Sequence, residues 1–180
     1  MITKENIMEC VLTHNPTHMI EVKPKTFEVT DEVRRACEVN TCGKYNKNWY
    51  CPPHTGTVSE CQEAIFTFPN GILVQNVYTI EDSWDFEGMS DAGHKHNDMM
   101  REIRDILREK DADAKIEVYS AGGCNFCEKC TCPDAECRFP GKGMYSIEGM
   151  GVNVYHLVEK NGLKYINGVN TVSYVGVILF

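Results

Sequence analysis

Ten cysteines, an unusually large number for a chain of 180 residues, are gathered mainly in two segments. The first segment holds Cys37, Cys42, Cys51 and Cys61. The second segment places five cysteines within fourteen positions, at Cys124, Cys127, Cys130, Cys132 and Cys137. The remaining cysteine, Cys10, is isolated, and we expect it to be inert. Cysteines clustered in this way serve either as disulfides or as metal ligands.

The composition favours metal binding over disulfide bonding as the role of the clustered cysteines. A disulfide framework is typical of small secreted domains that cannot build a hydrophobic core. Here hydrophobic residues make up 42% of the chain, which is enough for a core without crosslinks. The first residues, MITKENIMECVLTHNP, lack the apolar region of a signal peptide. We therefore expect a cytoplasmic protein whose clustered cysteines bind metal.

The charge of the chain argues against two classes of partner. The formal net charge is −8 and no run of basic residues occurs, whereas nucleic-acid phosphates favour clustered Lys and Arg. The longest apolar run near the C-terminus, YVGVILF, is too short to span a bilayer. We expect neither nucleic acid nor membrane as a partner.

The residues around the cysteines predict an α/β or α+β fold. We expect helices at 31–37, 57–68, 90–110 and 152–162, and strands at 71–80, 114–121 and 169–180. Thr57 and Glu60 predict a capping box at the start of the second helix. The core order is then strand, helix, strand, helix, strand, with right-handed crossovers wherever neighbouring strands are parallel. We expect a single domain over residues 1–180, with one small sheet, flanking helices and cysteine-rich metal-binding inserts at about 37–61 and 122–143.

The second segment follows the pattern C-x2-C-x2-C-x-C-x4-C. Three cysteines spaced by two residues and completed by a fourth are typical of [4Fe–4S] ligation. This spacing selects Cys124, Cys127, Cys130 and Cys137 as ligands and leaves Cys132 spare. A tetrahedral zinc site is the alternative, made by Cys124 and Cys127 with Cys132 and Cys137. The spacing and the soft thiolate ligands favour iron–sulfur over zinc.

The first segment is less regular. Cys37, Cys42 and Cys51 are separated by four and eight residues, a spacing that matches no standard zinc finger. The two prolines after Cys51 are similar to the Cys-Pro ending of ferredoxin runs. Cys61 lies within a predicted helix, so it is either a fourth ligand or a buried core residue, and we include it as a candidate ligand. The two segments either hold one cluster each or share a site.

Other polar residues near the second segment are candidates for binding a substrate or an anion. Arg138, Ser146 and Glu148 form this set. In the alternative interpretation, Ser146 caps a short turn and Glu148 pairs with a surface base. His94 and His96 have metal-compatible spacing, but we expect both to be solvated on an exposed helix. The sequence assigns no catalytic residue.

The cysteine segments resemble a known family. Five motifs carry the resemblance: C-x4-C-x2-Y-x3-W-x-CPP at 37–53, GGC-x2-C-x2-C at 122–130, CRFP at 137–140, S-x-E at 146–148 and GVNV at 151–154. They are similar to motifs of the predicted metal-binding proteins known as domain of unknown function 2284. The resemblance covers roughly residues 30–180. It implies a bound metal, iron–sulfur in type, and an anaerobic or archaeal style of metabolism, without a defined reaction.

Together these features predict a small iron–sulfur protein with one or two [4Fe–4S] clusters that transfers electrons to a redox partner protein. The first alternative is an iron–sulfur enzyme in which one iron lacks a protein thiolate and binds substrate. The second is a non-enzymatic module with structural zinc.

Overall fold

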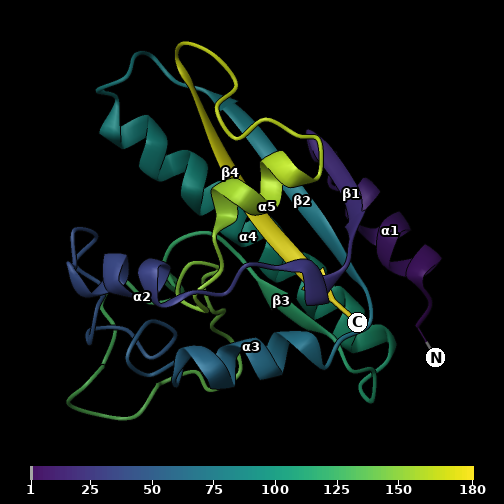
Figure 1. Cartoon of the computed structure of the whole chain (residues 1–180), viewed down its shortest axis with the longest axis horizontal. Helices are drawn as coiled ribbons and strands as arrows, with labels where there is room; N and C mark the ends of the chain where they lie inside the picture. Colours follow the sequence, from purple (N-terminus) through teal and green to yellow (C-terminus); the bar gives the residue numbers. More distant parts are fainter. Residues whose placement is uncertain (1) are drawn as a thin grey trace.

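A four-stranded antiparallel sheet in the order β1-β2-β4-β3 lies at the centre of the molecule (Figure 1). Its strands are β1 (His18–Val22), β2 (Gly71–Thr79), β4 (Thr171–Leu179) and β3 (Glu117–Tyr119). The computed structural model describes residues 2–180, and within that range the fold is mixed α+β. Because every neighbouring pair of strands is antiparallel, the crossovers expected between parallel neighbours are absent from the described sheet.

Five α-helices, within the same described range, surround the sheet: α1 (Lys4–Leu12), α2 (Asp31–Glu38), α3 (Val58–Phe66), α4 (Phe86–Lys110) and α5 (Val154–Lys160). A short 3-10 helix, η1 (Pro24–Thr26), follows β1. The predicted capping box of α3 is confirmed, because the Thr57 side chain accepts the Glu60 N–H and the Glu60 carboxylate accepts the Thr57 N–H. Each helix and strand predicted from the sequence is present, whereas α1 and β1 were not predicted.

Two hydrophobic cores cover the two faces of the sheet. Ile72 and Val74 of β2 pack with α1 and α4 on one face, and Leu73 packs with α3 and α5 on the other. This alternation follows from the two-residue period of a strand, which sends successive side chains to opposite faces. The result is a three-layer arrangement with helices on both sides of the sheet.

Two glycines allow α4 to approach β4 closely. A Cβ atom at Gly93 would lie 3.1 Å from the Tyr174 ring, and one at Gly176 would lie 2.8 Å from the sulfur of Met100. The helix begins at Phe86, four residues before the predicted start, because the Asp85 side chain accepts the Gly88 N–H and caps it. The long α4 therefore lies tightly along the sheet and offers one side to the loop that follows β3.

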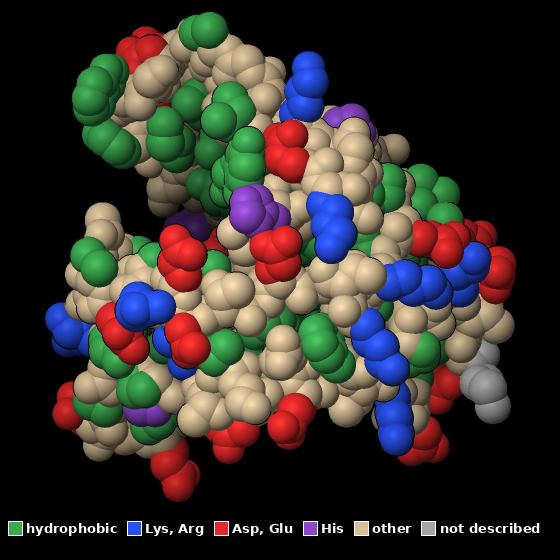
Figure 2. Space-filling model, viewed as in Figure 1, with side chains coloured by type: hydrophobic (Ala, Val, Ile, Leu, Met, Phe, Trp, Pro, Cys, Tyr) green, Lys and Arg blue, Asp and Glu red, His purple; other side chains and the backbone are tan. Residues whose placement is uncertain are grey.

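The surface in Figure 2 has exposed hydrophobic side chains gathered near the start of α4 and the loop before β4. Trp84, Phe86, Ile166 and Val169 are the large exposed residues of these two segments. This region is separate from the cysteine-rich segments, which lie near α2 in Figure 1. In the part of the chain that the structure describes, no helix has the length and apolar character needed to cross a membrane.

Candidate metal centre

The two cysteine-rich segments lie against each other. The Asn48 side-chain amide donates a 2.7 Å hydrogen bond to the carbonyl oxygen of Cys124. A Cβ atom added to Gly123 would lie 2.8 Å from the Cys51 sulfur, so only glycine fits beside that thiol. The fold therefore brings together two segments that are separated by 62 residues in the sequence. All ten cysteines, each within residues 2–180, are free thiols.

Four cysteines of the second segment line one small cavity of about 20 Å³. They are Cys124, Cys127, Cys130 and Cys137, which are the four that the spacing selects for a [4Fe–4S] cluster. The aromatic rings of Tyr50, Phe126 and Phe139 form much of the remaining wall. The cavity thus offers soft sulfur ligands inside a mostly apolar shell, which limits the access of water.

Cys132 is not among the residues that line this cavity. It is buried, at 6% exposure, and belongs instead to an adjoining open groove of about 380 Å³. Lys44, Lys47 and Lys129 also line that groove. The groove shares Cys124, Cys127 and Cys130 with the cysteine cavity, so solvent and positively charged side chains have access to these three cysteines.

Arg104 of α4 fixes the far end of the second segment. Its side chain is 1% exposed and donates a 2.7 Å hydrogen bond to the carbonyl of Gly143. The same guanidinium forms an ion pair with Asp105 at 2.9 Å, and Lys142 lies 3.8 Å from that carboxylate. A buried guanidinium with these partners is a rigid support, because its planar donors fix the direction of each hydrogen bond.

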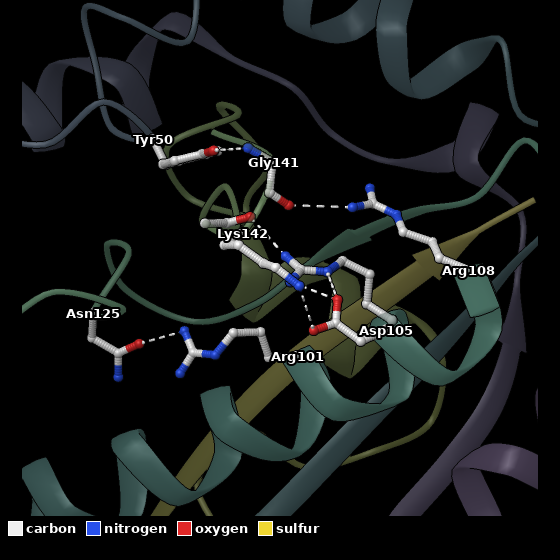
Figure 3. Close-up of polar contacts among 9 residues, drawn as sticks. Tyr50, Arg101, Asp105, Arg108, Asn125, Gly141 and Lys142 are labelled. Atoms are coloured by element: carbon white, nitrogen blue, oxygen red, sulfur yellow. Dashed lines mark hydrogen bonds and ion pairs between the residues drawn. The ribbon is translucent and has the colours of Figure 1, made fainter. Parts of the chain in front are cut away.

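Two other arginines of α4 extend this support along the loop. Arg101 donates to the Asn125 side chain at 3.1 Å and lies 5.4 Å from the centre of the Phe126 ring. One turn beyond Arg104, Arg108 donates to the carbonyl of Gly141 at 3.4 Å. Figure 3 shows these side chains reaching from one side of the helix toward the loop. The helix therefore positions both ends of the segment that carries the four cysteines.

The three irregularly spaced cysteines of the first segment interact electrostatically. Burial raises the pKa of the Cys51 thiol to about 12, with smaller upward contributions from Cys42 and Cys37. Burial also raises the pKa of Cys37, to which Glu148 and Cys42 add, while Arg34 lowers it. Ionisation of one of these thiols therefore opposes ionisation of the others.

Cys61 has a different environment. Its thiol donates to the Thr55 carbonyl at 3.2 Å and accepts a 3.4 Å hydrogen bond from Arg34. The residue is 1% exposed and belongs to the core on the α3 and α5 face of the sheet. Its hydrogen bonds and packing are those of the buried core residue that was one of the two expectations for it.

A tight turn at residues 146–151 contacts the first segment. The Ser146 hydroxyl accepts the Gly149 N–H at 2.8 Å, which is the turn-capping role considered for it from the sequence. Arg138 lies elsewhere and donates to the Lys129 carbonyl at 2.8 Å, within the second segment. The structure therefore gives Arg138 and Ser146 separate hydrogen-bond partners and shows no contact that joins them within residues 2–180.

One interpretation of the sequence paired the Glu148 side chain with a surface base, and the structure gives this side chain a different environment. Within the described residues it forms no ion pair, and its Oε2 atom is buried without a hydrogen-bond partner. Burial raises the pKa of this carboxyl, although hydrogen bonds from its own backbone and that of Gly122 act in the opposite direction. The carboxyl group is therefore held inside the protein, at the start of the second cysteine segment.

The two histidines of α4 have unequal environments. His94 is exposed, as expected, but the expectation for His96 is wrong, because that side chain is completely buried. The His96 Nδ1 atom lies 3.2 Å from the Asn76 amide, which acts as its donor. Its ring stacks on Tyr174, so this residue is part of the packing between α4 and the sheet.

In residues 2–180, no three or more Cys, His, Asp or Glu side chains are already arranged with the close geometry of metal ligands. The residues nevertheless include donors suited to a metal centre, because four cysteines line one cavity and a buried carboxyl oxygen of Glu148 has no hydrogen-bond partner among the described residues. Metal binding and the final ordering of ligand side chains are coupled processes.

An α+β chain that brings two cysteine-rich segments together, with four cysteines lining one cavity, has the architecture expected of a metal-binding protein. A family model described as "Predicted metal-binding protein (DUF2284)" matches residues 20–180, and the chain belongs to this family. Searches of curated proteins and of solved structures found no match.

Proposed function

We propose that this protein binds iron–sulfur clusters of the [4Fe–4S] type through its cysteines and transfers electrons to a partner protein. The observation that carries the proposal is the common cavity of Cys124, Cys127, Cys130 and Cys137. A thiolate-bound [4Fe–4S] cluster accepts and releases one electron at a time. The cysteines would hold this group.

The protein around the cavity favours such a role. Asn48 and Arg104 hold the two ends of the ligand segment through the carbonyls of Cys124 and Gly143. Phe126 and Phe139 pack edge to face, with ring centres 5.1 Å apart, and line the cavity together with the four cysteines. Limited water access and fixed ligand geometry are the means by which a protein sets a reduction potential.

The position of the cavity supports electron exchange with a partner. Phe126 is 39% exposed and Phe139 is 46% exposed, so these rings lie between the sulfur ligands and the solvent. A redox partner that docks over the two rings approaches the centre without any change in the core. Exposed aromatic side chains are also common in protein–protein interfaces.

Zinc is the competing metal, and one observation favours iron over it. The zinc alternative requires Cys132 and leaves out Cys130. The cavity contains Cys130 and not Cys132, as the iron–sulfur set does, whereas the adjoining groove is lined by Cys132 together with Cys124, Cys127 and Cys130.

The proposal is tested by anaerobic purification, followed by counts of iron, zinc and acid-labile sulfide and by a visible absorption spectrum. We expect a brown protein with iron and sulfide in equal amounts. A Cys124→Ser variant should lose this metal, whereas a Cys10→Ser variant should retain it, because Cys10 lies in the core against α4. A colourless protein with stoichiometric zinc and no sulfide would overturn the proposal.

A further inference from the structure

Four large hydrophobic side chains at one end of the sheet are exposed to solvent. Trp84 is 78% exposed and Phe86 is 68% exposed, whereas Ile166 and Val169 reach 75% and 86%. We call these four residues the end patch. Most Trp and Ile side chains in folded proteins lie largely out of contact with water. A group of exposed ones at a single place is typical of a surface that binds another molecule.

Two segments that are distant in the sequence form the end patch. One segment links β2 to α4, and the other links α5 to β4. The strands β2 and β4 are paired up to Thr79 and Thr171, and just beyond them the Ile80 N–H donates to the Asn170 carbonyl at 2.9 Å. Both segments therefore leave the sheet at the same end (Figure 1), where hydrophobic side chains gather on the surface (Figure 2).

Hydrogen bonds hold the aromatic part of the end patch in place. The Asp82 carboxylate accepts the Trp84 N–H at 2.7 Å. The Asp85 carboxylate accepts the Gly88 N–H at 2.8 Å, which fixes the start of α4. The rings of Trp84 and Phe86 lie edge to face, with their centres 6.3 Å apart. A surface that is already ordered loses little conformational entropy when a partner binds to it.

Acidic side chains flank these two aromatic residues. Residues 48–94 contain no Lys or Arg, and within this range the segment before and at the start of α4 carries five carboxylates, at Glu81, Asp82, Asp85, Glu87 and Asp91. Of these, Glu81, Glu87 and Asp91 are exposed and form no ion pair within residues 2–180. The other segment, residues 161–170, adds a single charge, that of Lys164. The end patch therefore has an apolar centre and a negatively charged rim.

The charge of the rim selects the class of partner. In a symmetric dimer the same patch faces itself, so a second copy of this chain would bring like charges together. Anionic membranes and nucleic acids are repelled for the same reason. A protein surface with apolar side chains flanked by Lys or Arg matches both the centre and the rim, because interfaces commonly combine an apolar core with a polar edge of complementary charge.

We propose that the end patch is a docking site for a basic partner protein, which packs apolar side chains on Trp84, Phe86, Ile166 and Val169 and places Lys or Arg beside the carboxylates of residues 81–91. The aromatic side chains supply most of the affinity, and the carboxylates supply the salt dependence and the preference for basic partners. The patch is separate from the cysteine-rich segments, so docking does not depend on a bound metal.

The test uses the purified full chain and two synthetic amphipathic helical peptides. One peptide consists of leucine and lysine, and in the other every lysine is replaced by glutamate. The fluorescence anisotropy of a dye attached to each peptide reports its binding. We expect the lysine peptide to bind and the glutamate peptide to remain free. An increase of the salt concentration from about 50 to about 300 mM should weaken binding of the lysine peptide about tenfold.

A first pair of variants tests the apolar centre. Trp84→Ser combined with Phe86→Ser should weaken binding of the lysine peptide about thirtyfold, because aromatic anchors dominate the affinity of an interface. The matched control is Leu12→Ser combined with Val39→Ser, which changes two hydrophobic residues that are 56% and 75% exposed at other places on the surface. This control should bind the peptide as the wild type does.

A second pair of variants tests the rim. Glu81→Gln, Glu87→Gln and Asp91→Asn together should weaken binding of the lysine peptide about tenfold and remove most of its salt dependence. The control neutralises three exposed carboxylates elsewhere and should have little effect, with the substitutions Glu9→Gln, Glu63→Gln and Glu109→Gln. The total charge of the protein is the same in the two triple variants, so a difference between them reports the position of the charges.

Binding of the lysine peptide with wild-type affinity by both end-patch variants would overturn the proposal, and so would equal affinity for the two peptides. Two other occupants are tested directly. Dimerisation in sedimentation experiments that the change of Trp84 and Phe86 abolishes would identify a second copy of the chain. Binding to phosphatidylcholine vesicles without binding to the lysine peptide would identify a lipid surface. Either result refutes a basic protein partner.

Discussion

The side chain of Asn48 joins the two cysteine-rich segments through the backbone of Cys124. Its amide nitrogen donates to the Cys124 carbonyl at 2.7 Å, and its oxygen accepts the Tyr50 N–H at 3.0 Å. The residue is 1% exposed, so both hydrogen bonds are shielded from water. Asn48 therefore holds Cys124 of the second segment against the first segment.

Replacement of Asn48 with Asp should destabilise the protein. The carboxylate cannot donate to the Cys124 carbonyl and would place its negative charge against that oxygen, at a cost of about 2 kcal/mol in the free energy of unfolding. Chemical denaturation in the presence of a chelator measures this change without a metal contribution. Asn167→Asp is the control, because the Asn167 amide also donates to a backbone carbonyl but lies in a more exposed loop. Equal losses in the two variants would contradict the role of Asn48.

Arg104→Met should loosen the end of the second segment. It would leave the Gly143 carbonyl without its 2.7 Å donor and Asp105 without its buried partner, which costs about 3 kcal/mol in the free energy of unfolding. Metal should also dissociate faster, since α4 no longer fixes the loop. Arg108→Met serves as the comparison, because this exposed side chain makes only a 3.4 Å contact with Gly141. Unfolding curves and the rate of iron release to a chelator provide the two measurements.

Cys132 and Cys130 should respond differently to substitution with serine. Cys130→Ser removes a residue of the four-cysteine cavity, so we expect loss of most of the iron and sulfide of that centre. Cys132→Ser changes a buried residue outside the cavity and should leave the metal content unchanged. Metal and sulfide analysis of the two purified variants distinguishes between these outcomes. The reverse result, with iron lost only in Cys132→Ser, would show that the zinc-type ligand set is the correct one.

Acid should destabilise the protein through His96. Burial lowers the pKa of this imidazole from 6.5 to about 4, because the charged form loses its hydration. The unfolded chain therefore binds a proton that the folded chain does not, and stability falls as the pH decreases from 6.5 toward 4. The full effect is about 3 kcal/mol in the free energy of unfolding.

A His96→Gln variant isolates this contribution. Urea unfolding of both proteins at several pH values between 7 and 4 gives the free energy of unfolding at each. The variant should show a weaker pH dependence over this range, because glutamine does not titrate. Parallel curves for the two proteins would mean that His96 is not the group responsible.

Local signals in the sequence were sufficient for much of the fold. The Thr57 and Glu60 capping box and the Asp31–Glu38 helix depend on residues within a few positions of one another. The helix α1 was missed because its capping box uses Asn6 in place of the usual Glu or Gln. The antiparallel order of the sheet was beyond prediction for another reason, since it depends on pairing between strands such as β2 and β4 that are distant in sequence.

At the candidate site, too, local sequence signals allowed prediction, whereas contacts between distant residues did not. The spacing of Cys124, Cys127 and Cys130 predicted residues that line one cavity, because three-residue steps are a local property. Neither Asn48 nor Arg104 was predicted, since each acts through a backbone carbonyl of a remote residue and no short motif marks such a contact. The burial of His96 was also missed, because α4 buries polar residues beyond its apolar stripe against β4.

The position of β4 between β2 and β3 has a consequence for biosynthesis. Both cysteine-rich segments precede β4 in the chain, so the ribosome releases all ten thiols before the strand that completes the sheet. Until β4 emerges, β2 has only β1 as a partner and β3 has none among the strands described. The nascent chain therefore exposes its thiols to metal ions and oxidants before its core can close.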